Sequence, residues 1–319
     1  MTEYFASLDP SALMRACPGG LAQGLIWGIM ALGVYLTFRI LDIADLSVDG
    51  SFATGGAVSI MLILNGWNPE ISLVIALMAG LVVGCVPGIL HTRLGIPAIL
   101  AGILTQIALY SINLNIMGKA NQAINVSQVS LRITSNSELL TRTIILTTIG
   151  VLVLICILYY TFGTEIGCAF RATGNNDVMS RSLGINTDHM KIMGLAISNG
   201  LVALSGGMLA QFQGFADVNM GRGAIVIGLA AVIIGEVLGE LIFGKQMQFF
   251  LRLLFTVIGG IIYYLVYVFV LWLKFPANDM KLLTAIVVAI FLAVPYLNSK
   301  RKTSFHHAGQ VAKKTGGED

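Results

Sequence analysis

The chain has 319 residues, of which 56% are hydrophobic and only 11% are charged, and its formal net charge is +3. A soluble domain carries about 25% charged residues, so this composition excludes a surface covered by water alone. The small net charge gives no reason to expect nucleic-acid binding. The four cysteines are scattered, without the pairs that a zinc site or a disulfide framework needs. We therefore expect an integral membrane protein without a cysteine zinc site or a disulfide framework.

Membrane-crossing helices need about 20 mostly apolar residues, and nine segments of the chain approach this length. They lie near residues 20–38, 51–66, 70–91, 96–117, 141–162, 190–210, 223–242, 248–273 and 279–297. A transmembrane barrel would instead show segments of about ten residues that alternate between apolar and polar. The sequence therefore predicts an all-α, polytopic membrane helical bundle with about nine spans, in a range of about eight to ten, of which the second is short and Gly-rich.

The predicted spans place the two chain ends on opposite sides of the membrane. We expect residues 1–297 to form a single transmembrane domain and residues 298–319 to form a basic, disordered tail in the cytoplasm. With the tail inside, Lys and Arg residues are more numerous on the cytoplasmic side, as the positive-inside rule requires. The first nineteen residues lack the basic stretch and apolar core of a cleavable signal peptide. With nine spans and the tail in the cytoplasm, the N-terminus is expected outside.

Three aspartates lie between the first and second predicted spans, in the stretch RILDIADLSVDGSF. They could form a metal site, a solvated loop or a break in a membrane helix. A calcium loop needs acidic ligands at alternate positions and a later Glu, whereas Asp42, Asp45 and Asp49 are three and four residues apart. This spacing argues against a metal site and predicts that all three lie on one face of a helix, with Ser47 and Gly50 available to cap or break it.

Glycines recur at every fourth position in two predicted spans. The two sets are Gly20, Gly24 and Gly28, and Gly80, Gly84 and Gly88. Spacing of four places each set on one helix face, where missing side chains allow a second backbone to approach. We expect close helix–helix contacts at both sets.

Residues 163–189 form the most polar loop on the predicted inner side and favour two short helices. The first helix is expected from about Thr164 to Thr173 and to end at Gly174, and Asn175 or Asn176 is expected to cap the second. One face of the first helix collects Ile166, Ala169, Phe170 and Thr173. Such a pair of helices suits a socket in a soluble partner, or it covers the chain's own helix ends.

Several polar side chains fall inside the predicted spans and are candidates for lining a path. They are Ser51 and Thr54, Gln106 and Asn113, and Ser198, Asn199 and Ser205. The alternative for each is a hydrogen bond that joins two helices.

Glu236 and Glu240 lie one turn apart near the inner end of the seventh predicted span. A carboxylate at the bilayer centre costs about 2.5–3.5 kcal/mol on insertion scales, and less near an interface. Each glutamate could reach water, face a soluble partner or pair with Lys245 or Arg252.

Two long stretches of the chain resemble one protein family. The runs GCAFRATGNNDVMSRSLGIN and ISNGLVALSGGMLAQFQGFADVNMGRGAIVIGLAAVIIGE, with the N-terminal ALGVYLTFRILDIADLSVDGSFATGGA, resemble the permease subunits of ATP-binding-cassette importers. The likeness is to the group of branched-chain amino acid and ribose permeases, and within it to a subgroup linked to tryptophan or tyrosine uptake. It covers residues 20–297. Arg222 stands where relatives often have a small or apolar residue, and the sequence gives no account of it.

The resemblance implies a set of partners and a role for two groups of residues. The partners are a second permease copy, expected as a homodimer although a heterodimer is possible, two cytosolic ATPases and an external or lipoprotein solute-binding protein, in a bacterial inner membrane. The loop at 163–189 becomes a cytoplasmic coupling-helix loop, in which Glu165, Gly167, Phe170, Arg171, Ala172, Gly174 and Asn175 couple to the ATPase. The aspartate stretch becomes a broken start of the second span, near the dimer centre or inner gate. Together with the polar residues inside the spans, the expected path or gate comprises Asp45, Ser47, Asp49, Ser51, Gln106, Asn113, Ser198, Asn199 and Ser205.

The expected function is therefore alternating access in a permease subunit, and not catalysis. The chain has no G-x-x-x-x-G-K-[ST] phosphate loop, so ATP and Mg are expected on the partner ATPase, with no cofactor in this chain. An aromatic amino acid is the expected solute on the subgroup likeness, while other amino acids, nucleoside-like or sugar-like solutes stay open. The alternatives are an ion-coupled secondary transporter or channel that uses Asp45, Asp49 or Glu236, and a membrane scaffold.

Overall fold

The protein is described from a computed structural model. It describes residues 10–124, 137–244 and 247–273, together with positions 282, 286, 289 and 293. The helices in this part are α2 (Pro10–Tyr35), the π-helix η1 (Leu36–Ile40), α3 (Val48–Leu64), α4 (Pro69–Thr92), α5 (Ala98–Met117), α6 (Ser137–Phe162), α7 (Glu165–Asn175), α8 (Asp177–Ser182), α9 (Thr187–Gln213), α10 (Ala224–Phe243) and α11 (Phe249–Trp272).

The predicted all-α, polytopic bundle is confirmed. Seven helices in the described part are long and apolar enough to cross a membrane, and α3 is an eighth apolar helix of 17 residues. These eight helices coincide with the first eight predicted spans. The ninth predicted span, 279–297, and the tail, 298–319, lie outside the continuously described ranges.

The helix ends follow local backbone chemistry. Pro69 begins α4, where the missing N–H of proline costs no intrahelical hydrogen bond. Gly118 and Gly214 end α5 and α9 with φ of 68° and 79°, in the left-handed region where glycine has no steric penalty.

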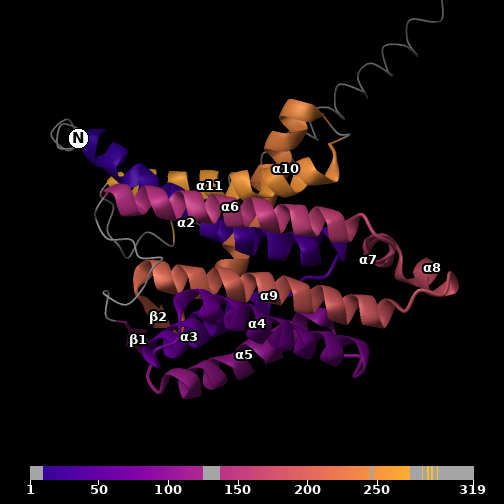
Figure 1. The fold of residues 1–319 in the computed structure, drawn as a ribbon. Coiled ribbons are helices and arrows are strands. Elements are labelled where there is room, and N and C mark those ends of the chain that lie inside the picture. Colours follow the sequence, from indigo (N-terminus) through magenta and orange to yellow (C-terminus); the bar gives the residue numbers. More distant parts are fainter. Residues whose placement is uncertain are drawn as a thin grey trace, which may run out of the picture.

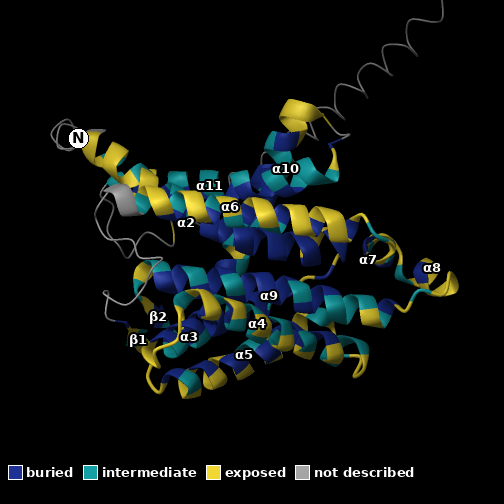
Figure 2. Cartoon of the chain, in the orientation of Figure 1, coloured by how far each residue is buried: buried dark blue, intermediate teal, exposed yellow. Residues whose placement is uncertain are grey.

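The spans pack in two groups (Figure 1). One group consists of α2, α6, α10 and α11, and the other of α3, α4, α5 and α9. The groups meet through contacts between α2 and α9. Among the seven helices of span length these two are the most enclosed, with 83% and 72% of the residues buried in their apolar stretches against 28% in α4, α5 and α6, and most residues of the shorter α3 are buried as well (Figure 2). The core therefore lies along the seam between α2 and α9.

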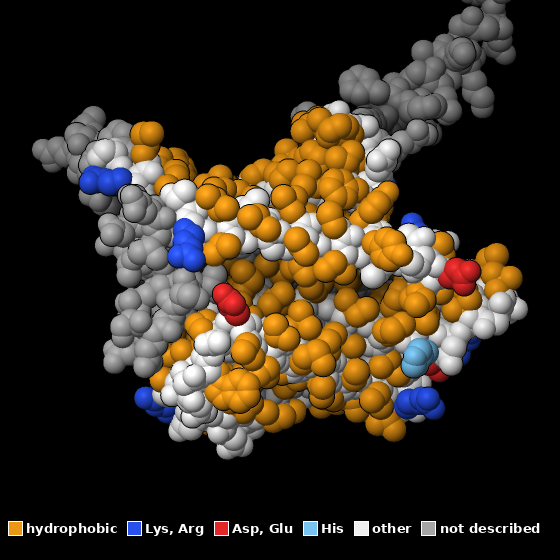
Figure 3. All heavy atoms as spheres, viewed as in Figure 1, with side chains coloured by type: hydrophobic (Ala, Val, Ile, Leu, Met, Phe, Trp, Pro, Cys, Tyr) orange, Lys and Arg blue, Asp and Glu red, His pale blue; other side chains and the backbone are white. Residues whose placement is uncertain are grey.

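Two short structures mark the opposite ends of the bundle (Figure 1). At one end, β1 (Asn121–Ala123) pairs antiparallel with β2 (Phe215–Asp217), with Gln122 opposite Ala216. At the other end, α7 and α8 connect α6 to α9. Between the two ends, the face in Figure 3 is covered by hydrophobic side chains, and its charged side chains lie toward the ends. This pattern fits a bundle that lipid surrounds at mid-height.

Both glycine sets make the close contacts that the sequence predicts. Gly20, Gly24 and Gly28 of α2 face α11, and Gly80, Gly84 and Gly88 of α4 face α9. A Cβ added at Gly24 would lie 2.7 Å from Ile261 Cα, and one at Gly84 would lie 2.7 Å from Ala196 Cα. No side chain fits at these distances, so each set brings two backbones together.

The second span is broken at its start, but the three aspartates do not share a helix face as the spacing predicts. Residues 41–47 form no helix, and α3 begins only at Val48. Asp42 has a φ of 55°, a conformation that Asp adopts more readily than most residues, and its side chain is exposed. Asp45 is buried in this segment, and Asp49 lies in the first turn of α3. The prediction was wrong because the spacing of a helix was applied to a segment whose backbone is not helical.

Candidate translocation path and coupling surface

A buried polar cluster lies where the broken segment meets the middle of α9. Asn199 Nδ2 donates to Asp45 Oδ2 at 2.7 Å, and the other oxygen, Asp45 Oδ1, accepts from the backbone N–H and the hydroxyl of Ser47 at 2.9 and 2.6 Å. Asn199 Oδ1 accepts from the hydroxyls of Ser47 and Ser51 at 3.2 and 2.5 Å. All four side chains are at most 3% exposed. We call Asp45, Ser47, Ser51 and Asn199 the central cluster.

The central cluster brings together residues that the sequence placed separately: Asp45 and Ser47 between the first two predicted spans, Ser51 on the second and Asn199 on the sixth. Its polar groups satisfy one another, as buried groups in a low-dielectric interior must. The cluster therefore fixes the non-helical segment 41–47 against α9.

Asp49 is bonded to the start of another helix. Its Oδ2 accepts from Gly223 N at 2.9 Å and its Oδ1 from Ile225 N at 3.0 Å. These donors belong to the N-terminus of α10, where free N–H groups and the helix dipole favour a negative charge. Asp49 thus caps α10 from α3.

Two predicted path residues join helices instead of facing a cavity. Ser198 Oγ donates to Gly33 O at 2.7 Å, and Ser205 Oγ donates to Ile26 O at 2.8 Å. Both bonds connect α9 to α2, across the seam between the two groups. Thr54 Oγ1 donates to Gly50 O within α3 at 2.9 Å.

The remaining predicted path residues line a cavity of about 370 Å³ between α3, α5 and the turn before α10. Asp49, Gln106 and Asn113 lie in its wall, and so does Arg222, which no sequence pattern explained. A shared cavity could not be predicted, because these residues come from three separate segments of the chain.

The polar loop forms the two helices that the sequence predicts, with different ends. Asn176 caps α8 by accepting from Met179 N at 2.9 Å, and Gly184 follows the helix with a φ of 85°. The first helix does not end at Gly174 but continues to Asn175. Gly174 is instead needed for space, because a Cβ there would lie 2.9 Å from Leu41 Cα.

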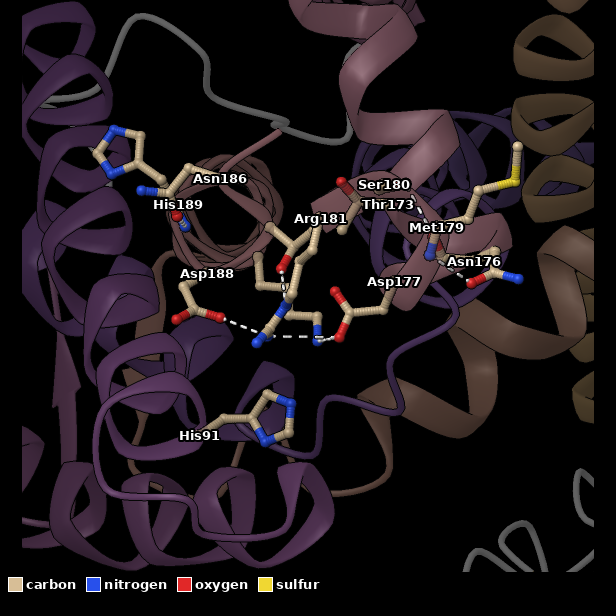
Figure 4. Close-up of polar contacts among 12 residues, drawn as sticks. His91, Thr173, Asn176, Asp177, Met179, Ser180, Arg181, Asn186, Asp188 and His189 are labelled. Carbon is tan, nitrogen blue, oxygen red and sulfur yellow. Dashed lines mark hydrogen bonds and ion pairs between the residues drawn. The ribbon is translucent and has the colours of Figure 1, made fainter. Parts of the chain in front are cut away.

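An ion-pair network holds α8 to the start of α9 (Figure 4). Arg181 lies between Asp188, at 2.8 Å, and Asp177, at 3.5 Å, and donates to Thr187 Oγ1 at 2.7 Å. Lys191 also reaches Asp177, at 3.1 Å. Partial burial disfavours the charged form of Asp177, but hydrogen bonds from Thr187 and Lys191 and the charges of Lys191 and Arg181 outweigh it, so the pKa of Asp177 is lowered.

The seven predicted coupling residues divide into a buried and an exposed set. Gly167 and Phe170 are buried, and Gly174 and Ala172 are partly buried. Glu165, Arg171 and Asn175 are exposed, and Arg171 Nη2 donates to Phe162 O at 2.8 Å.

The predicted apolar face of the first loop helix needs correction at Ile166, whose side chain is 55% exposed. The buried face of α7 is formed by Gly167, Phe170 and Thr173.

The apolar side chains that α7, α8 and the following residue expose were not predicted as one exposed surface, although Ile166 was expected on an apolar helix face. They are Ile166, Val178, Met179 and Leu183, which are between 55% and 78% exposed. The signal was present as apolar residues within a polar loop. We call these four residues the apolar rim.

Glu236 has a partner that the sequence did not predict. Arg39 Nε lies 2.7 Å from Glu236 Oε1, so the ion pair joins η1 to α10 and not α10 to Arg252. Arg252 Nε donates instead to Met247 O at 3.3 Å, and Lys245 lies outside the described residues.

Comparisons with known proteins agree with this architecture. The family model described as "Branched-chain amino acid transport system / permease component" matches residues 18–294. A tyrosine transport system permease protein of Clostridioides difficile is 41% identical over 285 residues, which are 89% of this chain and 93% of the relative. An uncharacterized protein of Rickettsia prowazekii is 33% identical over 86% of this chain and 95% of its own length.

More distant transport proteins match as well. An autoinducer 2 import system permease protein of Yersinia pseudotuberculosis is 33% identical over 63% of this chain and 56% of its own length. No solved structure matches this chain. The family match covers most of the chain, and the described helices have the length and apolar character of membrane spans. The chain therefore belongs to the permease component family of branched-chain amino acid transport systems and is an ABC-type permease subunit for a small solute.

Proposed function

We propose that this chain forms the translocation path of a bacterial importer for aromatic amino acids. An external or lipoprotein binding protein delivers the solute, and two ATPases, which hold ATP and Mg, bind a homodimer of this chain. The α7–α8 end faces the cytoplasm and the N-terminus lies outside. The name of the Clostridioides difficile relative supports the solute class, and the family supports the partners.

The observation that carries the proposal is the position of α7. This helix carries part of the apolar rim on its exposed side and packs against the start of the broken span on its buried side. Gly174 packs against Leu41, and a Cβ at Gly194 of α9 would lie 3.1 Å from Phe170 Cε1. The Phe170 ring also packs against Phe162 at the end of α6, with 5.6 Å between ring centroids. A push on α7 therefore reaches the start of segment 41–47, and Asp45 lies only four residues beyond Leu41.

In this mechanism the central cluster acts as the gate. In the present state its hydrogen bonds close the route between segment 41–47 and α9. Movement of α7 shifts Leu41, stretches the bonds to Asn199 and opens the route. A nucleotide-dependent bias of a few kcal/mol between two such states is sufficient.

The ion-coupled alternative has less support from the geometry. Its three carboxylates do not form one site, because Asp45 bonds to Asn199, Asp49 bonds to the N-terminus of α10 and Glu236 pairs with Arg39.

Two variants separate the docking of the ATPase from the transmission of its movement through α7 to the spans. Leu183→Asp places a charge on the apolar rim and is expected to lower ATPase recovery in co-purification at least tenfold, because the charge must be desolvated in the interface. Phe170→Ala leaves the rim intact but removes the contact between α7, α6 and α9. It is expected to retain the ATPase while ATP-driven uptake falls at least tenfold.

Asn65→Asp is the matched control, because it adds the same charge to an exposed position after α3, at the opposite end. It should alter neither recovery nor uptake. Full ATPase recovery with Leu183→Asp, or normal uptake with Phe170→Ala, would contradict the coupling route.

A further inference from the structure

Arg222 lies at mid-height of the bundle, between two glycines that contact Asp49. Gly221 packs against the Asp49 backbone, and Gly223 N donates to Asp49 Oδ2. The next residue of α3, Gly50, faces Gln106, whose Cα would lie 3.2 Å from an added Cβ. Gln106 is eight residues beyond the start of α5, about 12 Å along a helix of about 30 Å at 1.5 Å per residue. The backbone of Arg222 is therefore near the middle of the membrane-crossing part.

Arg222 is exposed where it lines the cavity, and no carboxylate pairs with it among the residues that the structure describes. Within the described ranges its side chain has no ion-pair or hydrogen-bond partner, although Asp49 lines the same cavity. A charged side chain at this depth is costly and marks a solute or ion pathway by default. The cavity is therefore a place where a ligand would complete the charge balance.

Asn113 provides an independent sign that the cavity lacks a ligand. Its side chain is fully buried in the cavity wall, and its Oδ1 has no hydrogen-bond partner in the described part of the protein. Its Nδ2 makes one long bond, of 3.4 Å, to Gly50 O. Buried amides that are left this incompletely bonded are rare and call for a partner.

The walls of the cavity combine two unlike charges with an apolar side. Arg222 offers a guanidinium that matches a carboxylate in two parallel hydrogen bonds. Asp49 offers carboxylate lone pairs that the two N–H bonds from α10 do not use up. Ile107 and Tyr110 supply the apolar side, and the volume of about 370 Å³ lies within the ~300–1,000 Å³ range of small-molecule sites.

We propose that this cavity binds a zwitterionic amino acid, with its α-carboxylate on Arg222, its α-ammonium on Asp49 and its side chain toward Ile107 and Tyr110. The proposal rests on the proposed function as an amino-acid importer, and it gives the permease a solute site of its own.

The test is equilibrium binding of radiolabelled tyrosine to the permease–ATPase complex in lipid nanodiscs, without binding protein. Tyramine, which lacks the carboxylate, and 3-(4-hydroxyphenyl)propionate, which lacks the ammonium group, are the competitors. The wild-type complex is expected to prefer tyrosine to either analogue at least tenfold. Arg222→Gln should abolish the preference over tyramine and keep the preference over the propionate, because only the carboxylate contact is lost.

Arg222→Lys should retain part of the preference, and Arg93→Gln is the matched control, since Arg93 is an exposed arginine after α4 and outside the cavity. A loss of protein stability alone would weaken the binding of all three ligands together and would not change the ratio of their affinities.

Uptake by proteoliposomes with the binding protein separates the two proposals. If the wild type takes up tyrosine but shows no binding in nanodiscs, or if Arg222→Gln keeps its preference over tyramine, the site is wrong and the importer stands. If the wild type takes up no amino acid in response to ATP, the proposed function itself fails, and the site proposal fails with it.

Discussion

At the scale of single residues, the most constrained side chains are those of the central cluster. Asp45 and Asn199 are buried in a bundle where lipid, not water, surrounds the helices, so each depends on the other for hydrogen bonds. Asn199 acts in both directions, as a donor to Asp45 and an acceptor from Ser47 and Ser51. A residue without both an amide N–H and an amide oxygen cannot replace it.

Exchange of the two partners tests this directional pairing. Asn199→Asp alone places two carboxylates side by side and removes the amide donor, and is expected to lower the free energy of unfolding by about 1–3 kcal/mol. Asp45→Asn combined with Asn199→Asp restores one donor and one acceptor and should recover most of this loss. Thermal unfolding of the purified variants in detergent measures both effects.

Asn65→Ala is the control for this series, because its side chain is exposed after α3 and should change the unfolding temperature little. An exchange variant that is less stable than Asn199→Asp would contradict the pairing.

Sequence patterns identified the members of the cluster but not their pairing. A polar residue inside a span signals a helix contact or a path, and this singled out Asn199 and Ser51. The partner of Asn199 is 154 positions away along the chain. Helix periodicity relates only residues a few positions apart, so it cannot predict this contact. Arg222 was noticed only as an exception, because its role depends on Asp49 and Asn113 in three-dimensional proximity.

At the scale of elements, glycine decides how closely the spans approach. The spacing of four in α2 and α4 predicted both contact faces, since this pattern depends only on helix geometry. From the sequence, the ends of α7 could be predicted only to within one or two residues. Gly174 looked like a helix end, but the chain uses its missing side chain to approach Leu41.

Enlargement of a contact glycine tests the packing of α4 on α9. Gly84→Leu forces a side chain against the backbone of Leu195 and Ala196 and is expected to lower the free energy of unfolding by about 1–3 kcal/mol through overpacking. The measurement is the midpoint of thermal unfolding in detergent.

Gly150→Leu in α6 is the matched control. In the described part of the chain a Cβ at Gly150 would meet nothing within 4 Å, so the same substitution should be neutral or slightly stabilising through helix propensity. Equal destabilisation by both variants would show that the cost does not come from the α4–α9 contact.

At the scale of the whole molecule, the division into two helix groups supplies the parts that alternating access needs. The groups meet along α2 and α9, where Ser198 and Ser205 form hydrogen bonds across the seam. The helix α7 contacts α6 and η1 in one group and α9 in the other. A force on α7 can therefore move one group relative to the other, which is how we propose that ATP hydrolysis drives transport.

The central claim is that ATP hydrolysis by partner subunits drives solute through this chain. The most direct measurement is uptake of radiolabelled tyrosine by proteoliposomes that contain the permease, its co-purified ATPase and the binding protein. We predict uptake that requires ATP, stops with a non-hydrolysable ATP analogue and persists when H⁺ and Na⁺ gradients are collapsed. Uptake that follows an ion gradient in the absence of ATP would contradict the account.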